Sequence, residues 1–120
     1  MSNEDVLDEG IILELEQLDA GGSGGFLAQI IGVFEEQAVE LLQQLEDSVR
    51  DEQVAQISAL SHKLKGSART VGGLRLGIHC EHLEQAARSQ EIVDGATQIS
   101  RIRNAYAELV VALHARLERP

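Results

Sequence analysis

Apolar residues recur every three to four positions along most of the chain, which is the spacing of one face of an α-helix. This periodicity predicts a short amphipathic helix at about residues 5–19 and four longer helices at about residues 26–50, 53–71, 74–89 and 95–118. A glycine-rich turn at residues 20–25 follows the short helix. The apolar stripe of the first long helix comprises Leu27, Ile31, Phe34, Ala38, Leu41, Leu45 and Val49. That of the second comprises Val54, Ile57, Leu60, Leu64, Ala68 and Val71.

The connections between the long helices are short, and short connections favour antiparallel neighbours. We therefore expect an all-α fold, an antiparallel up-down-up-down four-helix bundle with the short N-terminal helix lying over one end. At 120 residues the chain fits a single domain, residues 1–120, which can bury its own core without disulfides or a structural metal. Leucine, isoleucine, valine and alanine supply nearly all of the apolar surface, as is typical of helices.

His62 lies off the apolar stripe of the second long helix. At roughly 100° per residue it falls about 140° from the centre of that stripe. Lys65, Gly66 and Arg69 follow at three, four and seven positions, so they should share its side of the helix. The imidazole is therefore expected to face solvent.

Gly66 stands about one turn after His62 in the expected helix. A glycine inside a helix costs about 1 kcal/mol relative to alanine, so its presence there calls for a reason. A partner that must bring its own reacting atom close to the imidazole would need this position free of a side chain. The alternative is a surface glycine that the helix merely tolerates.

The charged residues are unevenly distributed. The formal net charge is −10, yet residues 53–80 contain Lys63, Lys65, Arg69 and Arg75 and no acidic residue. An anion held at His62 would thus lie in the one positive segment of the chain. The alternative is a chance cluster of cations on a solvated face.

Composition argues against several classes of partner. The acidic charge disfavours binding to a nucleic-acid backbone, and the near absence of aromatic residues removes base stacking. No apolar run is long enough to span a bilayer, so we expect no direct membrane contact. The single cysteine, Cys80, lies on an apolar stripe and should be a core residue in a reducing compartment. His79 and His82 flank it, but the three side chains should not converge, so we expect no metal site.

A longer pattern resembles a known family. The residues are His62-x-Leu64-Lys65-Gly66-Ser67-Ala68, with Gly72 ten positions after the histidine, and they are similar to the signature of the histidine phosphotransfer (HPt) modules of bacterial phosphorelays. The Gly-Gly-Ser-Gly-Gly turn before a helix with Phe34-Glu35-Glu36, and the later Cys80-x-x-Leu83-Glu84, extend the resemblance over nearly the whole chain. The chain departs from the usual pattern at Ser61 and at Gly73.

The resemblance implies that His62 accepts a phosphoryl group from a receiver-domain aspartate and passes it to another, through the ring nitrogen farther from the backbone. Neutral imidazole suits this role, because its unperturbed pKa of about 6.5 leaves much of it unprotonated near neutral pH. Lys65 should attract the phosphoryl oxygens. We assign Ser58, Lys63, Gly66 and Arg69 to the partner contact.

The resemblance also sets expectations for cofactors and location. The chain itself should carry no cofactor, because the partner would supply Mg²⁺ together with its aspartate. The expected partners are receiver domains of response regulators or of a hybrid sensor kinase, and the chain should be monomeric, cytoplasmic and without independent enzymatic turnover. It could equally be the cytoplasmic end of a membrane-anchored sensor kinase. Two other functions stay open, a helical adaptor that works without phosphorylation and a domain phosphorylated directly by a kinase catalytic domain.

Overall fold

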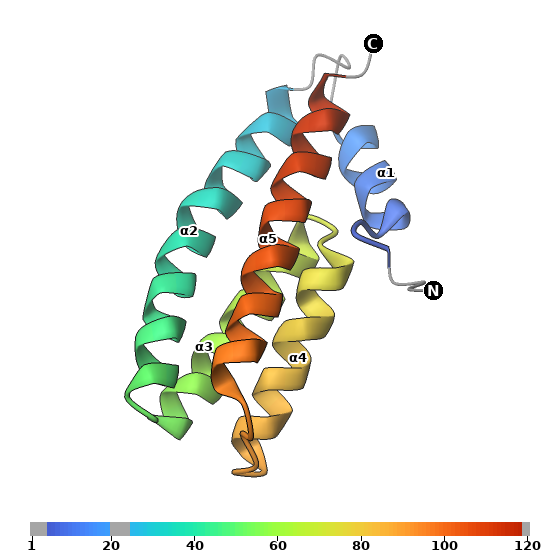
Figure 1. Ribbon diagram of the computed structural model, residues 1–120. Coiled ribbons are helices and arrows are strands. Elements are labelled where there is room, and N and C mark those ends of the chain that lie inside the picture. Colours follow the sequence, from blue (N-terminus) through green and yellow to red (C-terminus); the bar gives the residue numbers. More distant parts are fainter. Residues whose placement is uncertain (1–4, 20–24, 119–120) are drawn as a thin grey trace.

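The computed structural model describes residues 5–19 and 25–118. Within these residues the chain forms five α-helices, α1 (Glu9–Gln17), α2 (Gly25–Arg50), α3 (Val54–Thr70), α4 (Leu74–Arg88) and α5 (Gly95–Leu117). Figure 1 shows the four long helices running up and down beside one another, with α1 packed near the C-terminal end of α5. The expected all-helical bundle with a short N-terminal helix is thus confirmed. The expected turn at residues 20–25 lies outside the described residues, except for Gly25, which begins α2.

The core follows the helical periodicity with two shifts from the expected stripes. In α2 the chain buries Leu42 and Ser48, whereas Leu41 and Val49 are only partly buried. A straight helix drifts by about 20° per heptad from a strict seven-residue repeat, which accounts for the shift from Leu41 to Leu42. The buried Ser48 hydroxyl donates to the Gln44 carbonyl at 2.9 Å. In α3 the chain buries Ser61 rather than Leu60. The Ser61 hydroxyl donates to the Ile57 carbonyl at 2.6 Å, which satisfies it inside the core.

The turn between α3 and α4 sets how these two helices meet. Gly72 adopts a φ of 74°, and an added Cβ would lie 3.2 Å from both the Asp8 carbonyl and the Ile12 side chain. Only glycine accommodates this conformation without strain. The segment before α1 crosses the turn, since the Asp8 amide donates to the Gly72 carbonyl at 2.8 Å and the Leu74 amide to the Val6 carbonyl at 3.0 Å. The turn is therefore held firmly, and α4 runs back alongside α3.

The short helix α1 is anchored to the bundle by both apolar and ionic contacts. Its Ile12 is fully buried in the core. Arg116 of α5 reaches Glu9 at 2.6 Å and Glu16 at 2.9 Å, so one guanidinium bridges two turns of α1. Throughout the described ranges, none of the helices has the length and apolar character that crossing a bilayer requires.

Candidate functional site

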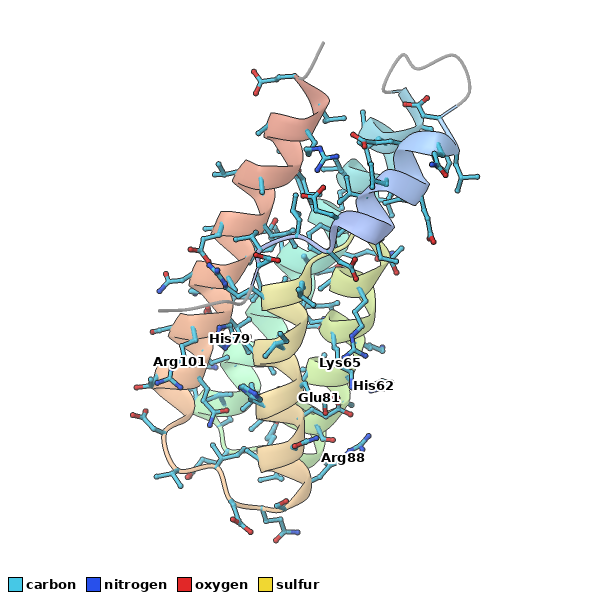
Figure 2. All side chains as sticks on the ribbon, turned by 90° about the vertical axis from the view of Figure 1, so that its right-hand side faces the viewer. His62, Lys65, His79, Glu81, Arg88 and Arg101 are labelled. Atoms are coloured by element: carbon cyan, nitrogen blue, oxygen red, sulfur yellow. The ribbon has the colours of Figure 1, made fainter. Side chains whose placement is uncertain are left out.

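His62 lies on the solvent side of α3, as its place in the sequence predicts. Its side chain is 62% exposed, and Figure 2 shows it beside Lys65 and Glu81 where α3 and α4 run together. Leu64 and Ala68, on the opposite side of the same helix, are fully buried. The amphipathic pattern of α3 therefore turns this imidazole outward.

Glu84 of α4 holds one nitrogen of the exposed ring. Its Oε2 lies 3.0 Å from Nδ1 of His62. An ionised carboxylate can only accept, so Nδ1 carries the hydrogen and donates it. In the neutral ring the free lone pair then resides on Nε2, the nitrogen farther from the backbone. Glu84 thus selects both the tautomer and the orientation of the histidine.

The Glu84 carboxylate is buried, with 1% of its surface exposed, and it is charged nevertheless. Burial alone would raise its pKa. Hydrogen bonds from Lys65 and His62, together with the positive charges of Lys65 and Arg88, outweigh burial and lower the pKa. Lys65 Nζ lies 2.6 Å from Oε1, and Arg88 Nη2 lies 2.7 Å from Oε2. A buried carboxylate with this many donors stays ionised at neutral pH.

Lys65 is buried, although its place in the sequence puts it on the same side of α3 as the exposed His62. It is 9% exposed, and its ammonium donates to Glu84 at 2.6 Å and to Glu81 at 3.0 Å. The hydrogen bonds to Glu84 and then Glu81 raise its pKa, so it remains a cation. The long side chain turns from α3 towards the carboxylates of α4, which periodicity within α3 cannot reveal. Lys65 therefore joins two helices and also lies next to the histidine.

The positive field expected around His62 is partly cancelled by these carboxylates. Arg69, which is 61% exposed, lies 3.9 Å from the Glu81 carboxylate. The cluster holds three cations, Lys65, Arg69 and Arg88, against Glu81 and Glu84, which leaves one net positive charge. The two acids lie just past the acid-free segment and face back onto it. An anion on His62 would meet a weak positive field.

Gly66 leaves an open space one turn beyond His62. A Cβ added there would meet no atom within 4 Å, so no packing within this chain requires the glycine. Gly66 and Lys63 line one wall of a groove of about 630 Å³ between α2 and α3. The wall formed by α2 is mostly apolar and includes Phe26, 38% exposed, and Val33, 49% exposed. The sequence signal for this groove is the presence of apolar residues beyond the core stripe of α2, such as Phe26 and Val33.

The other residues assigned to the partner contact lie on the same helix. Ser58 lies one turn before His62 and is half-buried, whereas Lys63 is exposed at the rim of the groove. Arg69 is exposed as expected, although it leans towards Glu81. α3 therefore presents all four residues assigned to the partner contact at least partly to solvent.

The remaining histidines and the cysteine do not form a second site. The rings of His79 and His82 stack edge to face with centroids 6.1 Å apart, and Cys80 points into the core. Burial raises the pKa of the Cys80 thiol to about 12, so it stays protonated and unreactive. His114 pairs with Glu35 at 2.5 Å. Across residues 5–19 and 25–118, no three histidine, cysteine or acidic side chains are grouped as metal ligands.

Solved structures share this fold at low sequence identity. Histidine-containing phosphotransfer protein B (HptB) of Pseudomonas aeruginosa is 18% identical, with a TM-score of 0.84 and 96% of each chain covered. The histidine-containing phosphotransfer protein ZmHP2 of maize is 23% identical, with a TM-score of 0.77, covering 94% of this chain and 88% of that chain. Ypd1 of Saccharomyces cerevisiae, crystallised with the receiver domain of its downstream response regulator Ssk1, is 18% identical with a TM-score of 0.68, covering 95% of this chain and 92% of that one.

The family itself is shown by the sequence. No curated protein matches the chain. A family model, the Hpt domain, matches residues 29–112, which is well over half of the chain and includes His62 and Glu84. The exposed histidine, the fold and this match agree, and the chain therefore belongs to the Hpt domain family of phosphotransfer proteins.

Proposed function

We propose that His62 accepts a phosphoryl group from the aspartyl phosphate of one receiver domain and passes it to the aspartate of another. The observation that carries this proposal is the contact between His62 and Glu84. It leaves an exposed imidazole with Nδ1 protonated and the Nε2 lone pair directed away from the contact. A nucleophile with a fixed tautomer and open access is what the transfer needs.

The transfer step needs only the His62 imidazole and the aspartyl phosphate of the donor receiver. The Nε2 lone pair forms a bond to phosphorus, and the bond between phosphorus and the donor aspartate oxygen breaks, leaving its electron pair on that carboxylate. The Nδ1 proton stays in place, so the phosphorylated ring carries a positive charge. Glu84, 3.0 Å away, stabilises this charge.

The same contact favours onward transfer. A ring that keeps its Nδ1 proton departs from phosphorus as neutral imidazole, whereas a deprotonated ring would have to depart as an anion. Glu84 is ionised and buried, so it accepts the hydrogen bond from Nδ1 and keeps the proton on the ring in both directions of transfer. The chain in this role is an intermediate without turnover of its own.

The cations around His62 would stabilise the phosphoryl oxygens. Lys65 uses two of its three N–H donors on Glu84 and Glu81, which leaves one for a phosphoryl oxygen. Arg69 and Arg88 are 61% and 65% exposed and can turn towards the group. The proposed role of Lys65 is therefore to share its charge between the acids and the phosphoryl group.

The residues around His62 do not fit a divalent metal site of this chain. The two nearest carboxylates, Glu81 and Glu84, already accept from Lys65, and Glu84 accepts from His62 and Arg88 as well. Mg²⁺ would therefore arrive on the receiver domain beside its aspartate. There it would neutralise charge on the transferring group.

The groove beside Gly66 suits the docking of a receiver domain. Its α2 wall offers the partly exposed apolar residues Phe26 and Val33 within reach of the α3 face that carries Lys63 and Gly66. Apolar contact at such a groove would bring the receiver aspartate to the open side of His62. The structural relative Ypd1 was crystallised with a receiver domain, which supports receivers as the class of partner.

The test is transfer of labelled phosphoryl group from a panel of phosphorylated receivers to the wild-type chain. We expect an acid-labile, base-stable label that is lost in His62→Gln and kept in the control His82→Gln, which changes another exposed histidine. After removal of the donor, the label should move on to a second receiver. Equal labelling of His62→Gln would contradict the proposal. Labelling by a kinase and ATP without any receiver would indicate direct phosphorylation, and full partner binding and signalling by His62→Gln would indicate an adaptor.

A further inference from the structure

Glu81 occupies an unusual place for an acidic residue in a site that receives a phosphoryl group. It projects from α4 towards α3, and Figure 2 shows it close to Lys65 and His62. Its Oε1 lies 3.0 Å from Lys65 Nζ and 3.9 Å from Arg69 Nη2. Its Oε2 accepts a hydrogen bond from the Gln85 amide at 3.0 Å. The Glu81 carboxylate thus contacts two cations next to the histidine.

Glu81 is the second carboxylate that pairs with Lys65. Glu84, with 1% of its side chain exposed, already pairs with the ammonium at 2.6 Å. Glu81 is 31% exposed, so water partly solvates its charge. Water reaches the Glu81 side of this ion pair, which lowers the contribution of the pair to stability. The presence of Glu81 therefore calls for an explanation in the chemistry of the site.

A phosphoryl group on Nε2 of His62 brings about two negative charges into this cluster. It would be attracted by Lys65 and Arg69, the same cations that Glu81 contacts, and it would be repelled by Glu81 itself. The hydrogen bond from Lys65 lowers the pKa of Glu81, so the competing charge is present at neutral pH.

We propose that Glu81 competes with the phosphoryl group for Lys65 and Arg69, and so lowers the fraction of phosphoryl group that rests on His62 at equilibrium with a receiver domain. The inference builds on the proposed function of His62. A relay intermediate that bound its phosphoryl group too favourably would retain it. Glu81 is thus a residue that tunes the transfer equilibrium without touching the reacting atoms.

The experiment measures this equilibrium directly. A receiver domain that labels the wild-type chain is mixed with each variant, and the label on the two proteins is quantified once it stops changing. For Glu81→Gln we expect the ratio of labelled chain to labelled receiver to rise about fivefold, because one negative charge close to the phosphoryl group is removed. The matched control is Glu108→Gln, which neutralises an exposed acid that pairs with Arg75 at 3.0 Å on the α5 side of α4. Its ratio should equal that of the wild type.

A second variant separates charge from shape. Glu81→Asp keeps the negative charge, so its ratio should stay closer to the wild type than to Glu81→Gln. Equal ratios in the Asp and Gln variants would overturn the inference, as would an unchanged or lower ratio in Glu81→Gln. A lowered melting temperature of Glu81→Gln with an unchanged ratio would make Glu81 an ion-pair partner of the fold only. If none of the receivers exchanged label with the wild-type chain, the proposed function of His62 itself would be contradicted. That result is distinct from an unchanged ratio in Glu81→Gln.

Discussion

The Nδ1 atom of His62 lies 3.0 Å from Oε2 of Glu84, so an imidazole that is 62% exposed is fixed by a carboxylate that is 1% exposed. The reacting ring is open to a partner, whereas the group that orients it is shielded from water and from exchange with other ions. The orientation of the histidine is therefore set before a partner arrives. Such preorganisation lowers the entropic cost of orienting the ring in the transition state of transfer.

Neutralising that carboxylate should slow transfer. His62 and Lys65 contact different oxygens of Glu84, and an amide replaces one of these oxygens with an NH2 donor, so glutamine cannot accept from both in this geometry. We expect Glu84→Gln to lower the rate of phosphoryl transfer from a receiver about tenfold, the lower end of the effect of removing an orienting partner of a functional histidine. Stopped-flow or quench measurements at a temperature where circular dichroism shows the variant folded will check this. A rate equal to that of the wild type would rule out the orienting role.

The free energy of unfolding should fall at acidic pH because Glu84 becomes protonated. Its pKa is lower in the folded chain than the usual 4.5, against burial, because Lys65 and His62 donate to it. The ionised carboxylate stabilises the fold fully at pH values above the pKa of Glu84 in the unfolded chain. This stabilisation is lost as the pH falls from that pKa to the lower pKa of the folded chain. Denaturant titrations between about pH 6 and pH 3 should show a steeper fall in the free energy of unfolding for the wild type than for Glu84→Gln. Parallel curves would contradict the ion pairing.

Gly66 should matter to a protein partner and not to the fold. No atom lies within 4 Å of an added Cβ, so Gly66→Gln should raise the free energy of unfolding by about 0.5–1 kcal/mol through helix propensity. Transfer from a receiver should slow at least about tenfold, since a side chain then stands in the approach path. Phosphorylation by phosphoramidate, a donor of few atoms, should be unchanged.

Gly32→Gln is the control, because Gly32 is equally unobstructed and does not line the groove. It should gain stability without slowing transfer, and identical transfer rates in the two variants would refute the role of Gly66.

The groove between α2 and α3 should bind the receiver. Val33 lines it and is 49% exposed, whereas Val39 on the same helix is 59% exposed and lies outside it. Val33→Asp places a charge against the apolar partner surface and should weaken receiver binding about tenfold, as measured by isothermal titration calorimetry. Val39→Asp should leave the affinity unchanged. Equal affinities for both variants would remove the groove from the docking surface.

Features that depend on one helix at a time were predictable from the sequence. The outward position of His62 follows from its place relative to Leu64 and Ala68, and the structure confirms it. The helices α2 to α5 lie close to the expected ranges, because their apolar stripes and short connections leave few other arrangements. Burial at single positions, such as Leu42 instead of Leu41, depended on the drift of a straight helix against a seven-residue repeat.

Contacts between helices were not predictable in the same way. Periodicity placed Lys65 on the outer side of α3, but its ammonium lies against Glu81 and Glu84 of α4. The sequence did contain a signal, since Glu84 follows Cys80 by four positions and so falls within the buried stripe of α4. An acid in such a position needs a cationic or hydrogen-bonding partner, and a neighbouring helix can supply one. Which residue provides it is decided by the packing of α3 against α4.

The most direct measurement is to locate the phosphoryl group on the chain after transfer from a receiver. Fragmentation mass spectrometry assigns the residue, and nitrogen-15 and phosphorus-31 NMR assign the ring nitrogen. We expect a single phosphorylated residue, His62, bonded through Nε2, with the Nδ1 proton still donated to Glu84. Phosphate on His79, His82 or His114, or on Nδ1 of His62, would contradict the proposal that Glu84 holds one nitrogen and leaves the other to react.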